Sequence, residues 1–217
     1  MADGEQALRR GVALNPNFAL AHHWLSLSLI VQARMDEAME RSKRATELDP
    51  LSPAIWTHYG SVLACAGRPT DAVAAHDRSL AVQPDYHDAL RGKIHAQIEL
   101  GRISESLALA GRAPEGDART AGVQFFVHAR AGRKTEAEAL LANPRFSVGN
   151  TVEKIGGLPA LGRTEDAMAL LTTKQANLFA AGVYHWHPIL DSLRNDPRWV
   201  KLLADAGLTE AHARAQA

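Results

Sequence analysis

The sequence of 217 residues has a single cysteine, Cys65, and no apolar run long enough to cross a membrane. A lone cysteine excludes an internal disulfide framework and suits a reducing compartment. A membrane-spanning helix needs about 18 consecutive apolar residues. The amino-terminal MADGEQALRR also lacks the apolar stretch of a signal peptide. We therefore expect a cytoplasmic protein that makes no contact with a membrane.

The chain also lacks an excess of either charge, because 24 Lys and Arg residues balance 24 Asp and Glu residues. Without a net positive field, nucleic acid is not an expected partner. The sequence contains no phosphate-binding loop, no GxSxG turn, no HExxH motif and no paired-cysteine zinc spacing. These absences predict a protein that is not an enzyme, with no catalytic residues, no metal ligands and no cofactor.

The sequence does contain a period of 34 residues. Pro16, Pro50 and Pro84 are spaced at this interval, and they end the similar phrases VALNP, ATELDP and LAVQP. Proline stops a helix because it has no N–H group to donate, so each phrase is predicted to be a helix end. Abundant alanine and scarce Val and Ile favour helix over strand.

A second phrase recurs half a period later. It occurs as AGRPTDA at 66–72, LGRISES at 100–106, AGRKTEA at 131–137 and LGRTEDA at 161–167, with a looser copy, QARMDEA, at 32–38. Each glycine is expected to take the left-handed conformation that ends a helix. The Ser or Thr that follows is expected to cap the next helix; these residues are Thr70, Ser104, Thr135 and Thr164. Each repeat is therefore predicted to be a helix, a tight turn and a second helix.

These features resemble the tetratricopeptide repeat (TPR) family. Repeat 53–86 carries the family's marked residues at Trp56, Tyr59, Gly60, Leu63, Ala72 and Pro84, and repeat 19–52 carries Leu25, Ser26, Leu29, Ala38, Ala45 and Pro50. Repeat 87–117 departs from the pattern at Lys93 and Ile94. The resemblance implies an all-α fold, a right-handed α-solenoid of TPR-like helix-turn-helix repeats. It would have about five hairpins, a leading half-repeat and a C-terminal helical cap.

We expect five segments along the chain. They are a half-repeat at 1–18, regular TPR repeats at 19–117, degenerate TPR-like repeats at 118–175, a helical cap at 176–208 and a frayed tail at 209–217. In the degenerate part, Gly156, Gly157 and Pro159 should break the last first-position helix. Because a half-repeat leaves an apolar face uncovered, we expect the chain to be cut from a longer protein whose upstream part continues the rhythm.

The carboxy-terminal segment 187–208 has its own helix signals. Asp196 is predicted to cap a helix with Pro197 at its first position, and Gly207 is predicted to end it. The segment resembles the closing segment of repeat regions in bacterial adenylate cyclase and winged-helix regulators. That resemblance implies the regulatory C-terminal part of a larger bacterial signalling protein.

Helix packing within the repeats follows from residue size. The small residues Ala38, Gly60 and Ala72 are expected to let helices approach closely. Three large side chains, Trp24, Trp56 and Tyr59, are predicted to fill the core between hairpins.

The TPR resemblance also implies a ligand groove, because the first helices of the repeats line the concave face in that family. The side chains carried over to this face are Leu20, His23, Leu27, Ile30, Thr57, Ser61, Arg91, His95, Arg119, Phe126 and Arg130. The four basic side chains at its far end suit an acidic peptide or a C-terminal carboxylate. A solvated polar face without a ligand is the alternative.

Three functions therefore compete. The first is a scaffold that binds a protein or peptide partner on the concave face. The second is a homo-oligomerisation module, using the first helix or the region 148–190. The third is a metal-binding or enzymatic protein in which His185 and His187 are joined by Asp191 or His128. The simpler interpretation of the His-Trp-His phrase is packing of the cap with Trp186 buried.

Overall fold

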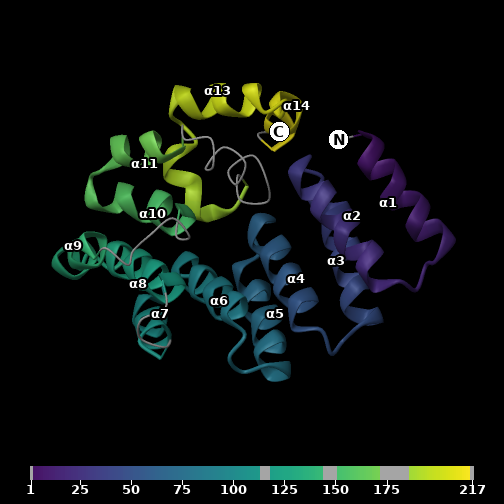
Figure 1. Cartoon of the computed structure of the whole chain (residues 1–217), viewed down its shortest axis with the longest axis horizontal. Coiled ribbons are helices and arrows are strands. Elements are labelled where there is room, and N and C mark those ends of the chain that lie inside the picture. The colour runs from purple at the N-terminus through teal and green to yellow at the C-terminus, as the bar shows by residue number, and fades with distance from the viewer. Residues whose placement is uncertain (1, 113–117, 144–150, 172–185, 216–217) are drawn as a thin grey trace. The chain divides into compact units, whose positions relative to one another are not determined.

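The computed structural model describes residues 2–112, 118–143, 151–171 and 186–215. Every regular element in these ranges is an α-helix or a 3-10 helix (Figure 1). The predicted class, an all-α helical repeat, is therefore confirmed. None of the helices in these ranges is both long enough and apolar enough to span a bilayer.

The chain divides into two compact units. The first unit comprises Met1–Ala96 and Leu208–Ala217, and the second comprises Gln97–Gly207. Helices of the first unit are α1 (Ala2–Leu14), α2 (Ala19–Val31), α3 (Met35–Leu48), α4 (Pro53–Cys65), α5 (Pro69–Val82) and α14 (Thr209–Ala215). The boundary between the units falls inside α6 (His87–Glu99). Consecutive helices from α1 to α5 pack against one another, as expected for stacked hairpins.

The second unit has shorter elements. They are α7 (Ile103–Ala110), α8 (Ala118–Arg130), α9 (Lys134–Ala142), α10 (Thr151–Gly157), the 3-10 helix η2 (Leu158–Leu161), α11 (Thr164–Leu171), the 3-10 helix η4 (Pro188–Leu193) and α13 (Pro197–Asp205). The predicted break is confirmed, because α10 ends at Gly157 and η2 follows with Pro159 in its first turn. A Cβ atom on Gly157 would lie 2.6 Å from Cε1 of Phe125, so this glycine also permits close packing of α10.

The glycine turns adopt the predicted geometry. Gly67, Gly101, Gly132 and Gly162 have φ angles between 70° and 77°. The looser copy of the phrase places Ala33 at the same point, with φ 56°, the one positive φ of a non-glycine residue in the described ranges. Alanine in this conformation is strained because its Cβ approaches the following carbonyl oxygen.

The predicted Ser and Thr caps are wrong. The N-cap positions are held by Arg68, Arg102 and Arg133, none of whose side chains makes a capping hydrogen bond. Helices α5, α7 and α9 begin two residues earlier than expected, so the predicted caps Thr70, Ser104 and Thr135 lie inside the first turn, and Thr164 is the first residue of α11. The cap arginine instead pairs with an acid three residues on: Arg68 Nε donates to Asp71 Oδ2 at 2.7 Å.

The predicted core is confirmed in its aliphatic part and wrong for Trp24. Leu25 and Leu29 of α2 are buried, whereas Trp24 keeps 54% of its surface exposed. Adjacent residues on a helix point about 100° apart, so the residue beside a core leucine turns away from the core. Trp56 and Tyr59 of α4 are only partly buried.

The predicted cap helix is confirmed. Oδ1 of Asp196 accepts a hydrogen bond from the backbone N–H of Arg198 at 2.9 Å, and Pro197 is the first residue of α13. Gly207 has φ 72°, which ends the helix as expected. Trp199 is buried, and so is Trp186 ahead of η4.

Candidate protein-binding faces of the first unit

The outward face of α2 carries exposed apolar side chains. Leu20 and Trp24 lie one helical turn apart and keep 46% and 54% of their surface exposed. Phe18, the residue before α2, is half exposed as well. Grouped exposed apolar side chains mark interaction sites more often than scattered ones do. The i, i+4 spacing of Leu20 and Trp24 was the available sequence signal, because Leu25 and Leu29 already supply the core side of α2.

A histidine pair beneath Trp24 holds this face in place. The ring of His23 packs edge-on against the rings of Trp24 and of His58 in α4, with centroids 5.1 and 4.4 Å apart. Ser26 donates its hydroxyl proton to the carbonyl oxygen of His23 at 2.8 Å, and its Oγ lies 2.5 Å from Nε2 of His58. Because that proton is already used, His58 must donate from Nε2.

Both histidines of the pair are neutral at physiological pH. Burial, together with the smaller effect of neighbouring His23, lowers the pKa of His58 to about 3. Burial also lowers the pKa of His23. A charged imidazole would lose more hydration energy on burial than the neutral ring does. The face around Trp24 is therefore uncharged where it meets α4.

The other predicted groove residues of the first unit differ in accessibility. Leu27, Thr57, Ser61 and Arg91 are half-buried, whereas Ile30 and His95 are buried. The hydroxyl of Thr57 lies 2.9 Å from that of Ser79 in α5. A guanidinium nitrogen of Arg91 lies 3.5 Å from a carboxylate oxygen of Asp88. The accessible apolar part of the predicted groove is thus on α2.

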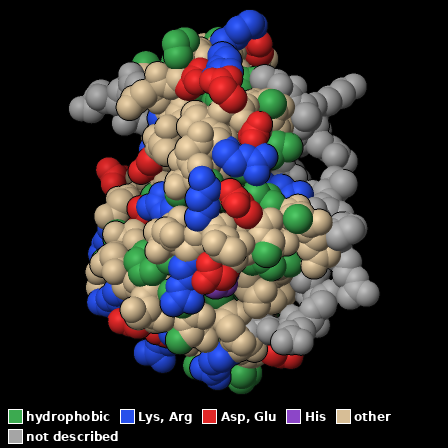
Figure 2. Space-filling view, turned by 90° about the vertical axis from the view of Figure 1, so that its left-hand side faces the viewer, with side chains coloured by type: hydrophobic (Ala, Val, Ile, Leu, Met, Phe, Trp, Pro, Cys, Tyr) green, Lys and Arg blue, Asp and Glu red, His purple; other side chains and the backbone are tan. Residues whose placement is uncertain are grey.

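The predicted groove residues of the second unit do not form an open basic surface by themselves. Phe126 is fully buried. Arg130 lies over its ring, 5.9 Å from the centroid, and 4.0 Å from a carboxylate oxygen of Glu99. The side chain of Arg119 lies outside the described residues. Acidic and basic side chains are likewise interspersed on the face shown in Figure 2.

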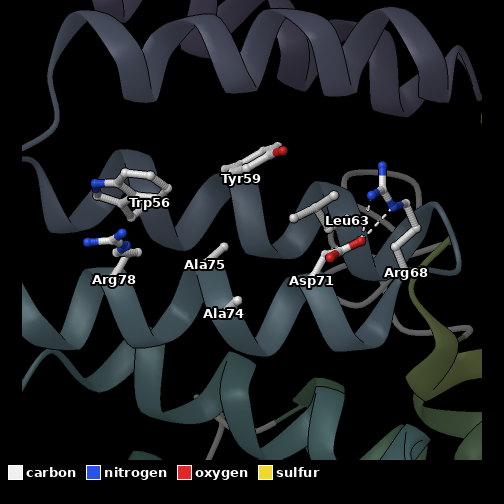
Figure 3. Close-up of a pocket in the computed structure, with 8 residues that line it drawn as sticks. All are labelled: Trp56, Tyr59, Leu63, Arg68, Asp71, Ala74, Ala75 and Arg78. Atoms are coloured by element: carbon white, nitrogen blue, oxygen red, sulfur yellow. Dashed lines mark hydrogen bonds and ion pairs between the residues drawn. The ribbon is translucent and has the colours of Figure 1, made fainter.

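A hollow of about 260 Å³ opens between α4 and α5 (Figure 3). Its α4 side is formed by Trp56, Tyr59 and Leu63, and its α5 side includes Ala74 and Ala75. Trp56 and Tyr59 were predicted to fill the core, because a bulky apolar stripe on a helix is normally covered by a neighbouring helix. Here the small alanines of α5 leave the two aromatic rings partly uncovered.

Charged side chains stand at the two ends of the hollow. Arg68 and Asp71 form an ion pair at one end, with 2.6 Å between Nη2 and Oδ2. At the other end Arg78 lies beside Trp56 (Figure 3). Arg78 is exposed and has no carboxylate partner within the described ranges. Burial raises the pKa of Tyr59, so its hydroxyl stays protonated at physiological pH.

The proposed metal ligands are not gathered in the described part of the chain. No three His, Cys, Asp or Glu side chains there are placed to share an ion, and His185 lies outside the described residues. His187 is buried and caps η4, its Nδ1 accepting from the N–H of Ile189 at 3.3 Å. Asp191 pairs with Arg194 at 2.9 Å, although burial raises the pKa of that carboxyl.

No protein-family model matches the chain. It is 32% identical over 95 residues to Protein FlbA of Caulobacter vibrioides, and the match covers 42% of this chain and 16% of that protein. It is 28% identical over 160 residues to the cellulose synthase operon protein C of Xanthomonas axonopodis pv. citri, covering 70% of this chain and 10% of that protein. The chain thus spans less than a fifth of the length of these curated relatives.

Solved TPR structures share the fold. The type IV pilus biogenesis factor PilW matches with a TM-score of 0.59 and 18% identity, covering 80% of this chain and 88% of that one. YrrB, described as a TPR protein with an unusual peptide-binding site, matches with a TM-score of 0.52 and 16% identity, covering 97% and 99%. A tetratricopeptide repeat protein of Parabacteroides merdae matches with a TM-score of 0.59 and 14% identity, covering 96% and 91%. The TPR-type fold predicted from the sequence is thereby confirmed.

Proposed function

We propose that this chain is a protein-interaction scaffold that binds a peptide or protein partner on the outward face of α2. The observation that carries the proposal is the exposure of Leu20 and Trp24 on one side of α2. Large apolar side chains left in water at adjacent positions favour a partner that covers them. The TPR-type fold supports this use, since YrrB, one of the structures that share it, is described as having a peptide-binding site.

The support beneath Trp24 makes the face suitable for recognition. His23 contacts the indole edge-on and packs in turn against His58, and Ser26 fixes His58 by a hydrogen bond. A side chain that is already held in its binding orientation loses little entropy when a partner arrives. Tryptophan is also among the residue types that most often dominate binding energy at interfaces.

We also propose that this chain is a regulatory part of a larger bacterial signalling protein in the cytoplasm. Two curated relatives are bacterial and much longer than this chain. An acidic partner would require Arg91 to exchange its contact with Asp88 for one with the ligand. The partner expected on α2 is apolar where it meets Leu20 and Trp24.

Site-specific photo-crosslinking in the host cell tests this proposal. A photoreactive amino acid in place of Trp24 should yield a discrete crosslinked partner, and Leu20→Glu in the same chain should remove it. A photoreactive residue in place of Leu51, which is 77% exposed in the turn before α4, is the matched control and should not capture that partner. Equal capture at both positions would reject the α2 face.

The same experiment distinguishes the scaffold from the second candidate function, homo-oligomerisation. The apolar face of α2 fits another copy of the chain as well as a different protein. A crosslink between two copies, together with a dimer in sedimentation velocity that Leu20→Glu dissociates, would establish homo-oligomerisation. A monomeric chain with a heterologous crosslink supports the scaffold.

A further inference from the structure

The hollow between α4 and α5 differs from the face of α2 in residue content and in charge. Trp56 and Tyr59 lie with ring centroids 6.3 Å apart and planes tilted by 55°. Arg78 stands at the Trp56 end (Figure 3). Trp, Tyr and Arg are the residue types that most often carry binding energy at protein interfaces. Their presence in one hollow calls for an occupant of defined chemistry.

The size of the hollow suits a single side chain. Its volume is about 260 Å³, whereas pockets for complete small-molecule ligands span about 300–1,000 Å³. Leu63, Ala75 and the two aromatic rings form an apolar floor, whereas the charged side chains make much of the remaining lining polar. A bulky aliphatic or aromatic side chain with a polar neighbour matches this lining.

The charge at the rim defines what lies next to that side chain. Arg68 is neutralised by Asp71 at 2.6 Å. Arg78 has no such partner within the described ranges, so the Trp56 end of the hollow keeps a net positive charge. A carboxylate of a partner protein can accept two parallel hydrogen bonds from a guanidinium.

Two of the side chains that line the hollow are also held in place before any ligand arrives. The indole N–H of Trp56 donates to the carbonyl oxygen of Pro50 at 2.9 Å. Arg68 is tied to Asp71 through Nε as well, at 2.7 Å. Side chains held in this way need little further ordering when they bind.

We propose that this hollow is a second recognition site, which takes a bulky apolar side chain of a partner protein whose neighbouring Asp or Glu pairs with Arg78. It lies on residues different from those of the α2 face, so the scaffold would hold a partner at two points or two partners at once. Two linked contacts of modest strength give a much higher overall affinity than either alone.

A pair of capped peptides tests the site directly. Gly-Phe-Glu-Gly supplies the ring and the carboxylate, and Gly-Phe-Gln-Gly supplies the ring alone. Titration of the chain, followed by NMR, should shift the indole N–H signal of Trp56, assigned from its loss in Trp56→Phe. We expect the acidic peptide to bind about fivefold more tightly, the upper value for one partly exposed ion pair.

Four variants locate the binding. Arg78→Gln should abolish the preference for the acidic peptide, and Ala74→Leu should block both peptides by filling the hollow at an exposed position. Arg10→Gln removes the same charge from an exposed position on α1 and should leave the affinity for both peptides unchanged. Leu20→Glu, which disables the α2 face, should also leave this binding intact, so the two proposals fail separately.

The proposal is overturned by any of three results. These are no shift of the Trp56 indole signal up to millimolar peptide, equal affinity for both peptides in the unaltered chain, or an equal loss of acidic preference in Arg10→Gln and Arg78→Gln. The last result would mean general charge attraction rather than a site.

Discussion

The two units pack their helices with different kinds of residue. In the first unit Gly60 of α4 and Gly92 of α6 both face the ring of buried His76 in α5, so the close packing of these helices is made on an imidazole. In the second unit Gly157 faces the phenyl ring of Phe125. An imidazole can take up a proton and a phenyl ring cannot. The comparison teaches that two similar helical repeats can differ in their response to pH.

Acid should have the largest effect on the difference in stability between the two units. Burial lowers the pKa of His58 to about 3 and that of His76 to about 4, from the ordinary 6.5. The unfolded chain therefore binds protons below pH 6.5 that the folded chain does not, and stability is lost as the pH falls. Each histidine contributes a loss of about 2 kcal/mol between pH 7 and pH 5.

Urea unfolding at pH 7, 6 and 5 measures this loss. The fluorescence of Trp56 reports on the first unit and that of Trp199 on the second, in chains that keep one tryptophan each. We expect the Trp56 transition to move to lower urea as the pH falls, by more than the Trp199 transition does. Replacing both His58 and His76 by Gln should remove most of the difference; an unchanged difference would contradict the assignment.

The glycine contacts give the next largest effect. A Cβ atom on Gly60 would lie 2.6 Å from Cε1 of His76, so Gly60→Ala should destabilise the first unit by about 1–3 kcal/mol through overpacking. In a His76→Ala background the same change should become stabilising by about 1 kcal/mol, because alanine is the better helix former. Thermal unfolding of the four chains checks this reversal of sign, which a simple loss of helix propensity cannot produce.

A partly buried ion pair should matter more than an exposed one. Burial alone would raise the pKa of Glu5, but hydrogen bonds from Gln32, Arg9 and Arg34 outweigh it and lower the pKa to about 2. Glu5→Gln should cost the first unit about 1–2 kcal/mol, as expected for hydrogen bonds to a charged group. In the second unit the fully exposed Glu165 pairs with Arg198 at 2.8 Å. Glu165→Gln is the matched control and should leave the urea midpoint unchanged.

The smallest predicted effect concerns the irregular turn of the first unit. Ala33 has φ 56°, where the other turns of this type have glycine. Ala33→Gly should stabilise the first unit by about 0.5–1 kcal/mol, because relief of backbone strain exceeds the greater chain entropy of glycine. The opposite change in the second unit, Gly132→Ala, should destabilise that unit. Calorimetry on both variants would refute the strain interpretation if the two melting temperatures shift in the same direction.

Turn geometry could be predicted from the sequence, whereas helix caps could not. The phrase around Gly67 predicts a left-handed residue because no other amino acid adopts that conformation without strain. The phrase leaves open whether Arg68 or Thr70 begins the next helix. In the structure Arg68 is the N-cap, Pro69 takes the first helical position, and the side chain of Arg68 pairs with Asp71.

Local sequence signals were sufficient to predict the repeat. Proline and glycine act through their own backbone restrictions, so the period, the helical class and the break at Gly157 follow from residue identity alone. Exposure is different, because it depends on which atoms from elsewhere in the chain cover a side chain. Trp24 faces outward because the core side of α2 is occupied by leucines, and Trp56 borders a hollow because α5 presents alanines to it. Only the tertiary structure could decide which tryptophans were available to a partner.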